Sequence, residues 1–468
     1  MLRILHHRFT RRSIRTRLPF KFGVQVLEEV PLAELEIRVE TSDGRQEIGR
    51  AGDLLVPKWF EKNPDTTPSE DSSALADSVE AAAVLGDQLT ATAGPHPVFD
   101  ITEVLRIERV GRRDHRDADV LVRGFGVAMV ERALIDAACR IAGVSFDEAV
   151  RSDLLGFSAR RLLPEVGEWS PAMLPSRRDR LPVRHTIGML DPLTDGDLEA
   201  AERVEDGLPQ TLVEDIHRHG IRRFKIKICG DRSVDESRLR SIAAIVAAHV
   251  DGETVFTLDG NEQCVDLEGL AGMLEDLGGD PATGPLIRRL ALLEQPLPRR
   301  DTFDPGHRAG LERLSRIAPV IIDEADTDAG AFRRALEAGY AGVSVKACKG
   351  VFRALANRGL VETVRAEGGV AFQSGEDLTN LASIPLQQDL CLQATLGVSD
   401  VERNGHHYFR GLDHLPESTA DRLVAVLPDL YQRRDGLREL RISEGLLDLR
   451  GLVDAAGFGG PLGSADGQ

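Results

Sequence analysis

Three carboxylates close three short apolar runs in the middle of the chain, and turn-forming residues follow each of them. They are Asp259, Glu294 and Asp323, in the segments 257–261, 292–296 and 321–324. A helix cap or turn explains one such acid well. Three in succession are better explained as ends of parallel barrel strands, which meet at one rim. Three hard oxygen ligands that leave room for substrate and water suit Mg²⁺, with Mn²⁺ as the alternative ion.

Lysine residues flank these acids along the chain. Lys225 and Lys227 lie in the segment 224–228, and Lys346 ends the run 343–346. Side chains alternate along a strand, so Lys225 and Lys227 share one side. On an isolated amphipathic strand that side would face solvent, but in a barrel the apolar side meets the helices and the lysines turn inward. Buried ammonium groups need partners, and a desolvated lysine near other cations has the lowered pKa that a general base requires.

Lys346 should lie roughly across the barrel from the lysine pair. Two bases on opposite faces of one bound carbon have the geometry for inverting or reprotonating a stereocentre. The acids and lysines together therefore predict an enzyme that removes a proton next to a metal-bound carboxylate.

A repeated strand-then-helix pattern begins near residue 181 and must position these side chains. We expect helices between the strands, for example at 234–248, 329–338 and 352–367. Strands joined by crossover helices form a parallel sheet, and seven or eight such units close into a barrel. The fold class is therefore α/β, with a modified (β/α)8 (TIM-type) barrel over residues 176–410. The expected strands are 183–188, 223–228, 255–259, 290–294, 320–323, 342–346, 370–373 and 398–402.

Residues 1–175 predict an α+β capping domain, completed by about 411–456. An alternating strand at 32–39 and helices at about 73–89 and 128–141 support this interpretation, with an exposed loop at 63–73. The Gly-rich tail 457–468 is expected to be disordered. The arginine-rich N-terminus lacks an apolar h-region, so we expect a first strand running toward residues 18–20 rather than a secretory signal.

The composition excludes several classes of function. A net charge of -18 argues against nucleic acid, whose phosphates would be repelled. No apolar stretch approaches the roughly 18 residues of a membrane helix. Five scattered cysteines without metal-type spacing indicate a reduced, cytoplasmic protein. We expect a small-molecule carboxylate as the partner and a homo-oligomer.

The ordered set of motifs resembles the enolase superfamily, and within it the muconate-lactonizing-enzyme-like and mandelate racemase family. The resemblance covers most of residues 15–410, including a helix at 130–136 like the one that ends the family's capping domain. The matching segments are Lys225-Ile226-Lys227, Asp259 with Asn261, Glu294-Gln295-Pro296, Asp323-Glu324, and Val345-Lys346 with Lys349-Gly350.

The resemblance implies a role for each matching position. Asp259, Glu294 and Asp323 would bind Mg²⁺. Lys227 and Lys346 would be the acid/base pair, the lysine-with-Mg²⁺ arrangement that is the known pattern of these enzymes. Lys225 would hold the substrate carboxylate and stabilise the enolate. Lysines on the second and sixth strands argue against the histidine-based dehydratase and mandelate racemase subgroups.

Substrate contacts are expected from both domains. The capping-domain segments 20–23 and 55–60 match the family's two loops over the barrel mouth. Trp59 is either part of a lid that excludes water or a core residue. Glu376 is either a substrate contact or a first-turn helix charge. Surface positions are the default for His406 and His407, and Asp400-Val401-Glu402 is too loose a match to the Asp-x-Asp pair of dipeptide epimerases. The expected substrate contacts are Phe22, Trp59, Asn261, Glu324, Gln373 and Glu376.

The most favoured reaction is racemisation or epimerisation through an Mg²⁺-stabilised enolate, because both bases are present. Cycloisomerisation and β-elimination (dehydratase or lyase chemistry) are alternatives, since cycloisomerases of this subgroup keep both lysines. A non-catalytic barrel scaffold, in which the acids cap helices, is the alternative from a different class.

Overall fold

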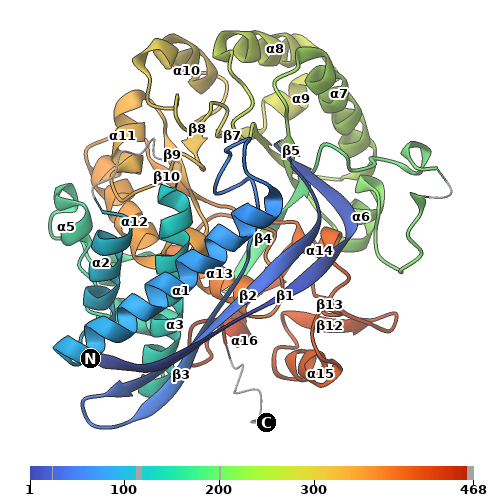
Figure 1. The fold of residues 1–468 in the computed structure, drawn as a ribbon. Helices are drawn as coiled ribbons and strands as arrows, with labels where there is room; N and C mark the ends of the chain where they lie inside the picture. The colour runs from blue at the N-terminus through green and yellow to red at the C-terminus, as the bar shows by residue number, and fades with distance from the viewer. Residues whose placement is uncertain (24, 112–118, 200–201, 461–468) are drawn as a thin grey trace.

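The protein consists of an N-terminal three-stranded sheet with helices, packed against an eight-stranded parallel barrel (Figure 1). The computed structural model describes residues 1–23, 25–111, 119–199 and 202–460. Buried apolar side chains from both parts form one continuous core. The fold class predicted from the sequence is confirmed.

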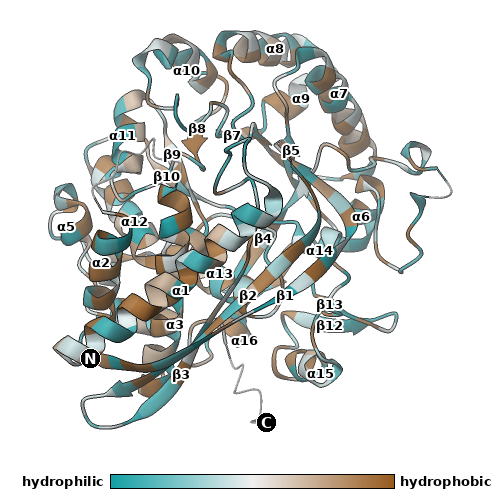
Figure 2. Ribbon diagram, viewed as in Figure 1, coloured by the Kyte–Doolittle hydropathy of each residue, from teal (hydrophilic) through white to brown (hydrophobic). Residues whose placement is uncertain are grey.

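The N-terminal sheet is an antiparallel meander of β1 (Leu2–Phe22), β2 (Gln25–Thr41) and β3 (Gln46–Leu54). Buried and exposed residues alternate along much of β1 and β2, as in a sheet with one wet face. Figure 2 shows this as a change between brown and teal along both strands. The arginine-rich N-terminus is therefore a first strand, as expected.

Helices cover the other face of this sheet. The longest begins earlier than the sequence suggested: the expected loop at 63–73 is cut short because Thr67 and Glu70 form a capping box and Pro68 occupies the first turn. Another helix packs so closely on β3 that a Cβ on Gly49 would lie 1.9 Å from the carbonyl oxygen of Ala133. The helices of this part are α1 (Pro68–Ala93), α2 (Val98–Arg109), α3 (Val120–Ala142), α4 (Phe146–Arg151) and α5 (Ala159–Leu162).

Eight parallel strands form the barrel, and β11 pairs with β4 to close it. Two of the predicted strands, 255–259 and 290–294, have the bounds expected from the sequence, and the others differ by a few residues. The strands are β4 (Arg180–Ile187), β5 (Arg223–Lys227), β6 (Val255–Asp259), β7 (Leu290–Glu294), β8 (Val320–Ile322), β9 (Gly342–Val345), β10 (Phe372–Gly375) and β11 (Val401–Arg403).

Each barrel strand except the last is followed by a crossover containing at least one helix, and these helices surround the strands (Figure 1). The helix directly after β11 is only a single turn. The helices are α6 (Leu212–His219), α7 (Arg232–His249), α8 (Leu267–Gly279), α9 (Gly284–Ile287), α10 (Arg308–Ser315), α11 (Ala331–Ala338), α12 (Val351–Ala366), α13 (Ile384–Leu396) and α14 (Gly405–Tyr408).

The C-terminal segment returns to both parts of the molecule. Its strand β14 pairs antiparallel with β4 at the barrel, and its last described residues contact the N-terminal part. Residues 457–460 were expected in a disordered tail, but the ring of Phe458 is buried and stacks 4.2 Å from Phe146. The elements are α15 (Glu417–Val426), β12 (Tyr431–Arg434), β13 (Leu437–Leu440), β14 (Leu446–Asp448) and α16 (Arg450–Val453).

The rest of the expected tail, 461–468, lies outside the described residues. Within the described part of the chain, no helix is both long and apolar enough to cross a membrane.

Candidate active site

The three predicted metal ligands lie at one end of the barrel. Asp259 and Glu294 end β6 and β7 and are neighbours in register, and Asp323 follows β8. All three are at most 1% exposed. The strand-end pattern therefore delivered three carboxylates to a common interior, as the sequence indicated.

Both lysines of β5 face this interior. Lys225 and Lys227 are 1% and 6% exposed, while Phe224 and Ile226 point to the surrounding helices and are fully buried. The Nζ of Lys227 lies 2.6 Å from Oδ2 of Asp259. The prediction that barrel closure turns both lysines inward is confirmed.

Lys225 is at the centre of a ring of acids. Its Nζ lies 2.9 Å from Asp259, 2.6 Å from Glu294, 2.8 Å from Glu376 and 3.0 Å from Glu402. An ammonium group has only three N–H donors, and here four carboxylates surround it and share those donors. Lys225 thus holds the acids in place.

Lys346 is held on the far side of the same interior. Its Nζ lies 2.5 Å from Oδ2 of Asp323 and 3.9 Å from Oε1 of Glu294. Lys349 supports this arrangement: its Nζ lies 3.0 Å from Oδ1 of Asp323 and donates to the hydroxyl of Ser344 at 2.7 Å. Asp323 therefore forms ion pairs with two lysines, Lys346 and Lys349.

The expectation of lowered lysine pKa values is wrong for two of the three lysines. Burial lowers the pKa of Lys346, but the charges of Asp323 and then Glu294 raise it more, so that it lies above its ordinary range. Burial likewise lowers the pKa of Lys225, and the surrounding carboxylates raise it further. The acids outweigh the desolvation on which the expectation rested.

The loops that carry the acids are held together by Gln295, a residue of the matching segment 294–296 to which the sequence analysis gave no role. Its side-chain oxygen accepts hydrogen bonds from the backbone N–H of Asp323 at 2.8 Å and Ala325 at 3.1 Å. Close packing also restricts the residue after Asp259, since a Cβ on Gly260 would lie 2.8 Å from the Cα of Pro296. Three successive strand ends are thus fixed relative to one another.

A small cavity of about 30 Å³ lies between the N-terminal part and the barrel mouth. Lys227 and Lys346 both line it, which places two lysines from opposite strands on one space. A larger hollow of about 850 Å³ lies outside the barrel beside Arg17 and Arg238 and contains none of the barrel acids. The small cavity is lined by Phe20, Phe22, Val56, Trp59, Lys227, Asn261, Lys346, Asp377, Leu378, Thr379, Glu402 and Asn404.

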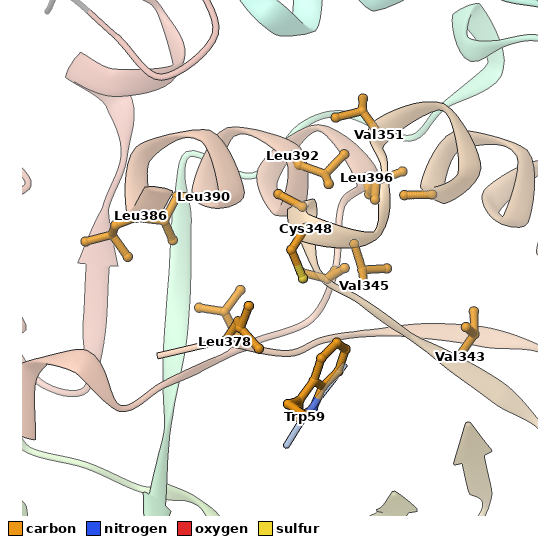
Figure 3. Packing of buried hydrophobic residues seen from close by; sticks show 14 of the residues in the cluster. Trp59, Val343, Val345, Cys348, Val351, Leu378, Leu386, Leu390, Leu392 and Leu396 are labelled. Carbon is orange, nitrogen blue, oxygen red and sulfur yellow. The ribbon is translucent and has the colours of Figure 1, made fainter. Parts of the chain in front are cut away.

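Trp59 combines the two alternatives that the sequence left open. It lines the cavity, and its ring lies 4.7 Å from Nζ of Lys346, a cation–π contact. It is also only 4% exposed, and Figure 3 shows it with Leu378 among the buried apolar residues near β9 and α13. Trp59 is therefore both a core residue and part of the cavity wall.

The other expected substrate contacts divide into two groups. Phe22 and Asn261 line the cavity. Glu324 is buried at its edge, where its Oε1 accepts a hydrogen bond from Asn261 at 3.2 Å, and burial raises its pKa to about 7. Gln373 is a correction: its amide donates to the carbonyl of Ala354 on α12, so it points away from the cavity.

Glu376 is neither a helix-terminal charge nor a cavity residue. No helix begins there, and its carboxylate lies 2.5 Å from Nη2 of Arg184 and 2.8 Å from Nζ of Lys225. Burial raises its pKa, but the charges of Arg184 and Lys225 lower it more, so it stays ionised. Glu376 is therefore an ion-pair partner of Arg184 and Lys225 in the barrel interior.

Arg184 and Glu402 were missed by the sequence analysis as interior groups. Arg184 is 1% exposed on the first barrel strand, and Glu402 lines the cavity from the eighth. The hydroxyl of Thr186 donates to Glu402 at 2.6 Å across the seam where β4 meets β11. Strand alternation is the signal that could have found them, given the pairing of these strands.

The donor set fits a hard divalent cation. Among the described residues, both oxygens of Glu294 are buried without a hydrogen-bond partner, although Nζ of Lys225 is close to one of them. Burial raises the pKa of Glu294 well above its usual range, and the charges of Asp259 and Glu376 add to this. Carboxylate oxygens lacking donors are the ligands that Mg²⁺ prefers.

Ammonium groups lie between the three acids. Lys225 bridges Asp259 and Glu294, and Lys346 bridges Glu294 and Asp323. The three acids are not close enough together to form a compact group of metal ligands. In the described part of the chain, ligand atoms within 4.8 Å of one another are found instead at His185, Asp215 and His406. Closer approach of the three acids therefore requires the lysines to move.

Comparison with known proteins gives structural neighbours only. No family model and no curated protein matches the chain. A Bradyrhizobium enolase complexed with magnesium and mandelic acid shares 16% identity at a TM-score of 0.58, covering 97% of each chain. The chain therefore shares the fold of this enolase structure.

Two further solved structures share this fold. A dipeptide epimerase from Enterococcus faecalis, complexed with Mg and L-Leu-L-Tyr, shares 15% identity at a TM-score of 0.59 and covers 98% of this chain and 99% of its own. A 2-chloromuconate cycloisomerase from Rhodococcus opacus shares 18% identity at a TM-score of 0.57, covering 98% and 95%. Epimerases and cycloisomerases thus share the arrangement, and the fold alone does not distinguish them.

Proposed function

We propose that this protein is an Mg²⁺-dependent enzyme of the enolase superfamily that abstracts the proton α to a substrate carboxylate, and that it acts as a racemase or epimerase. The observation that carries the proposal is the single cavity lined by both Lys227 and Lys346. A substrate carbon held there has an amine on two sides.

Each lysine has a distinct task in this proposal. Lys227, paired with Asp259, removes or returns the α-proton on one face of the substrate carbon, and Lys346, paired with Asp323, does so on the other. A proton taken by one lysine and replaced by the other inverts the stereocentre. Lys225 positions the carboxylates by neutralising several of them at once.

Asp259, Glu294 and Asp323 would hold the divalent ion. When bound, Mg²⁺ would supply Lewis-acid stabilisation of the substrate carboxylate and balance the acid charge that raises the pKa values of Lys225 and Lys346. The capping-domain residues Phe22 and Trp59 close the cavity from above and exclude water from the reacting carbon.

Cycloisomerisation and β-elimination are the alternative outcomes of the same first step. In these reactions the second lysine need not return a proton to the α-carbon. The presence of both lysines at the cavity supports racemisation or epimerisation, and the structural neighbours include both an epimerase and a cycloisomerase. The position and stereochemistry of deuterium at the α-carbon of the product distinguish racemisation or epimerisation from these alternatives.

A screen for α-proton exchange tests the proposal. The protein is incubated with Mg²⁺ in D₂O and a library of carboxylic acids that includes mandelate and L-Leu-L-Tyr, ligands of two structural neighbours. Deuterium uptake is read by mass spectrometry, and inversion by chiral chromatography. We expect exchange with inversion for at least one acid. Exchange that survives in EDTA would contradict the role of the metal, and exchange without inversion would favour the alternatives.

A non-catalytic scaffold predicts a different result. Mg²⁺ titration would then show no site dependent on Asp259, Glu294 and Asp323, and no acid would exchange. Homo-oligomeric assembly and a cytoplasmic location stay predictions from the sequence.

A further inference from the structure

A second group of titratable side chains lies outside the barrel. His185 comes from β4, Asp215 and His219 from α6, and His406 and His407 from α14. We call these five residues the histidine cluster. Asp215 is fully buried, His185, His407 and His219 are at most 4% exposed, and His406 is half-buried. Surface positions, the default expectation for His406 and His407, are therefore wrong for His407.

The ligand atoms of this cluster have the spacing of a metal site. One ligand atom each from His185, Asp215 and His406 lies within 4.8 Å of the others. Nδ1 of His185 and Nε2 of His406 are 3.2 Å apart. Two nitrogens on a tetrahedral Zn²⁺ with bonds of about 2.0–2.1 Å lie about 3.3 Å apart. The observed separation thus allows one ion to contact both imidazoles.

Hydrogen bonds within the protein leave much of the cluster unsatisfied. In the described part of the chain, Oδ1 of Asp215 and Nδ1 of His219 and of His406 are buried without a hydrogen-bond partner. Nδ1 of His407 lies 2.7 Å from Oδ2 of Asp215 and pairs with that oxygen. Buried polar groups in folded proteins nearly always have partners. So many orphaned ligand atoms in one place indicate a group that they bind.

We propose that His185, Asp215 and His406 form a second metal site, for a transition-metal ion of the Zn²⁺ type. Nitrogen ligands favour Zn²⁺ over Mg²⁺, which takes oxygen. His219, with Nε2 3.8 Å from Asp215, or water completes the coordination, and His407 orients Asp215. A cavity of about 30 Å³ that His219 and His406 help to line lies beside the cluster.

The location gives the site a structural task. β4 and β11 are the first and last barrel strands, and their pairing closes the barrel with a register that sets His185 opposite Arg403. An ion bound by residues of β4, α6 and α14 would cross-link these elements beside the β4–β11 pairing. The next residue on β4, Thr186, faces inward and donates to Glu402 of the cavity. The site would therefore hold the cavity wall in position without contacting substrate.

Metal content and coordination test the proposal. The full-length protein is stripped with a chelator, returned to Mg²⁺ buffer and titrated with Zn²⁺ alone, with Co²⁺ as a spectroscopic probe. We expect one tight site per chain, visible absorption typical of tetrahedral Co²⁺, and a higher unfolding temperature with Zn²⁺. Glu294→Gln should leave this site intact, because that acid belongs to the barrel interior.

The variant pair His406→Gln and His217→Gln provides the matched comparison. His217 lies on α6 in an exposed pair with His249, with ring nitrogens 3.1 Å apart. His406→Gln should weaken Zn²⁺ binding by more than the roughly 10–100-fold that loss of an outer partner costs, and His217→Gln should not. The proposal is overturned if the wild type binds no Zn²⁺ in the presence of Mg²⁺, if bound Co²⁺ shows an octahedral spectrum, or if His406→Gln binds as tightly as the wild type.

Discussion

Lys227 and Lys346 line one cavity, yet each ammonium is held by a different acid, Asp259 at 2.6 Å and Asp323 at 2.5 Å. The two lysines come from the second and sixth barrel strands, so they approach the same space from separate directions. Each lysine is paired with a proposed metal ligand. Binding of the ion to these acids would therefore change the electrostatic environment of both amines.

Glu294→Gln should keep the fold and abolish turnover. The substitution preserves shape but removes a charged oxygen from the donor set, so Mg²⁺ binding weakens. Calorimetric titration with Mg²⁺ and the exchange assay measure the two effects. The matched control is Glu253→Gln at an exposed position, which should change neither. Normal Mg²⁺ affinity in the Glu294 variant would remove that residue from the metal site.

Trp59→Ala should lower both stability and kcat/KM. From the sequence, a lid residue would affect rate with little change in melting temperature. Because the side chain is only 4% exposed, we now expect a loss of about 3–5 kcal/mol, as for other buried aromatics. Trp169, the other of two tryptophans, is also buried but lies away from the cavity. Trp169→Ala should lose stability without a comparable fall in kcat/KM, and equal falls would argue against a role for Trp59 at the site.

Glu131→Gln should remove a pH-dependent loss of stability. Glu131 on α3 accepts backbone hydrogen bonds from Val351 and Phe352 of α12, and burial raises its pKa from 4.5 to about 7. Below about pH 4.5 it is protonated in both folded and unfolded states. As the pH rises through about 7 the folded protein must ionise a buried acid, so this contribution, roughly 3 kcal/mol, is lost.

Denaturant unfolding at about pH 5 and about pH 8 measures this effect. The wild type should lose stability relative to Glu131→Gln at the higher pH, whereas the exposed Glu108→Gln should follow the wild type. A constant difference between wild type and Glu131→Gln across the range would show that Glu131 does not titrate there.

The barrel and its acids could be predicted because their signals are local. Apolar runs that end in an acid mark strand ends, and the alternation in 224–228 places Lys225 and Lys227 on one side. Gln373 was misplaced because the expected strand 370–373 begins and ends two residues before the observed one, Phe372–Gly375, so that Gln373 lies within the strand and not at its end.

Other residues depended on contacts that the sequence does not display. Glu402 enters the cavity because β11 pairs with β4, more than 200 residues earlier, and the histidine cluster joins β4 and α6 to α14, which lies far along the chain from both. The lysine pKa values depended on how many carboxylates surround each amine, which only the three-dimensional arrangement reveals.

Stereospecific exchange by single-lysine variants tests the two-base mechanism most directly. With the acid that the wild type exchanges fastest, each enantiomer is incubated separately in D₂O with Lys346→Ala, Lys227→Ala and Lys349→Met. The last is a buried lysine that binds Asp323 without lining the cavity. We predict that Lys346→Ala loses net conversion but still exchanges one enantiomer, that Lys227→Ala exchanges only the other, and that Lys349→Met retains exchange of both. Exchange of both enantiomers at wild-type rates by Lys346→Ala would show that Lys346 is not a base and would contradict the mechanism.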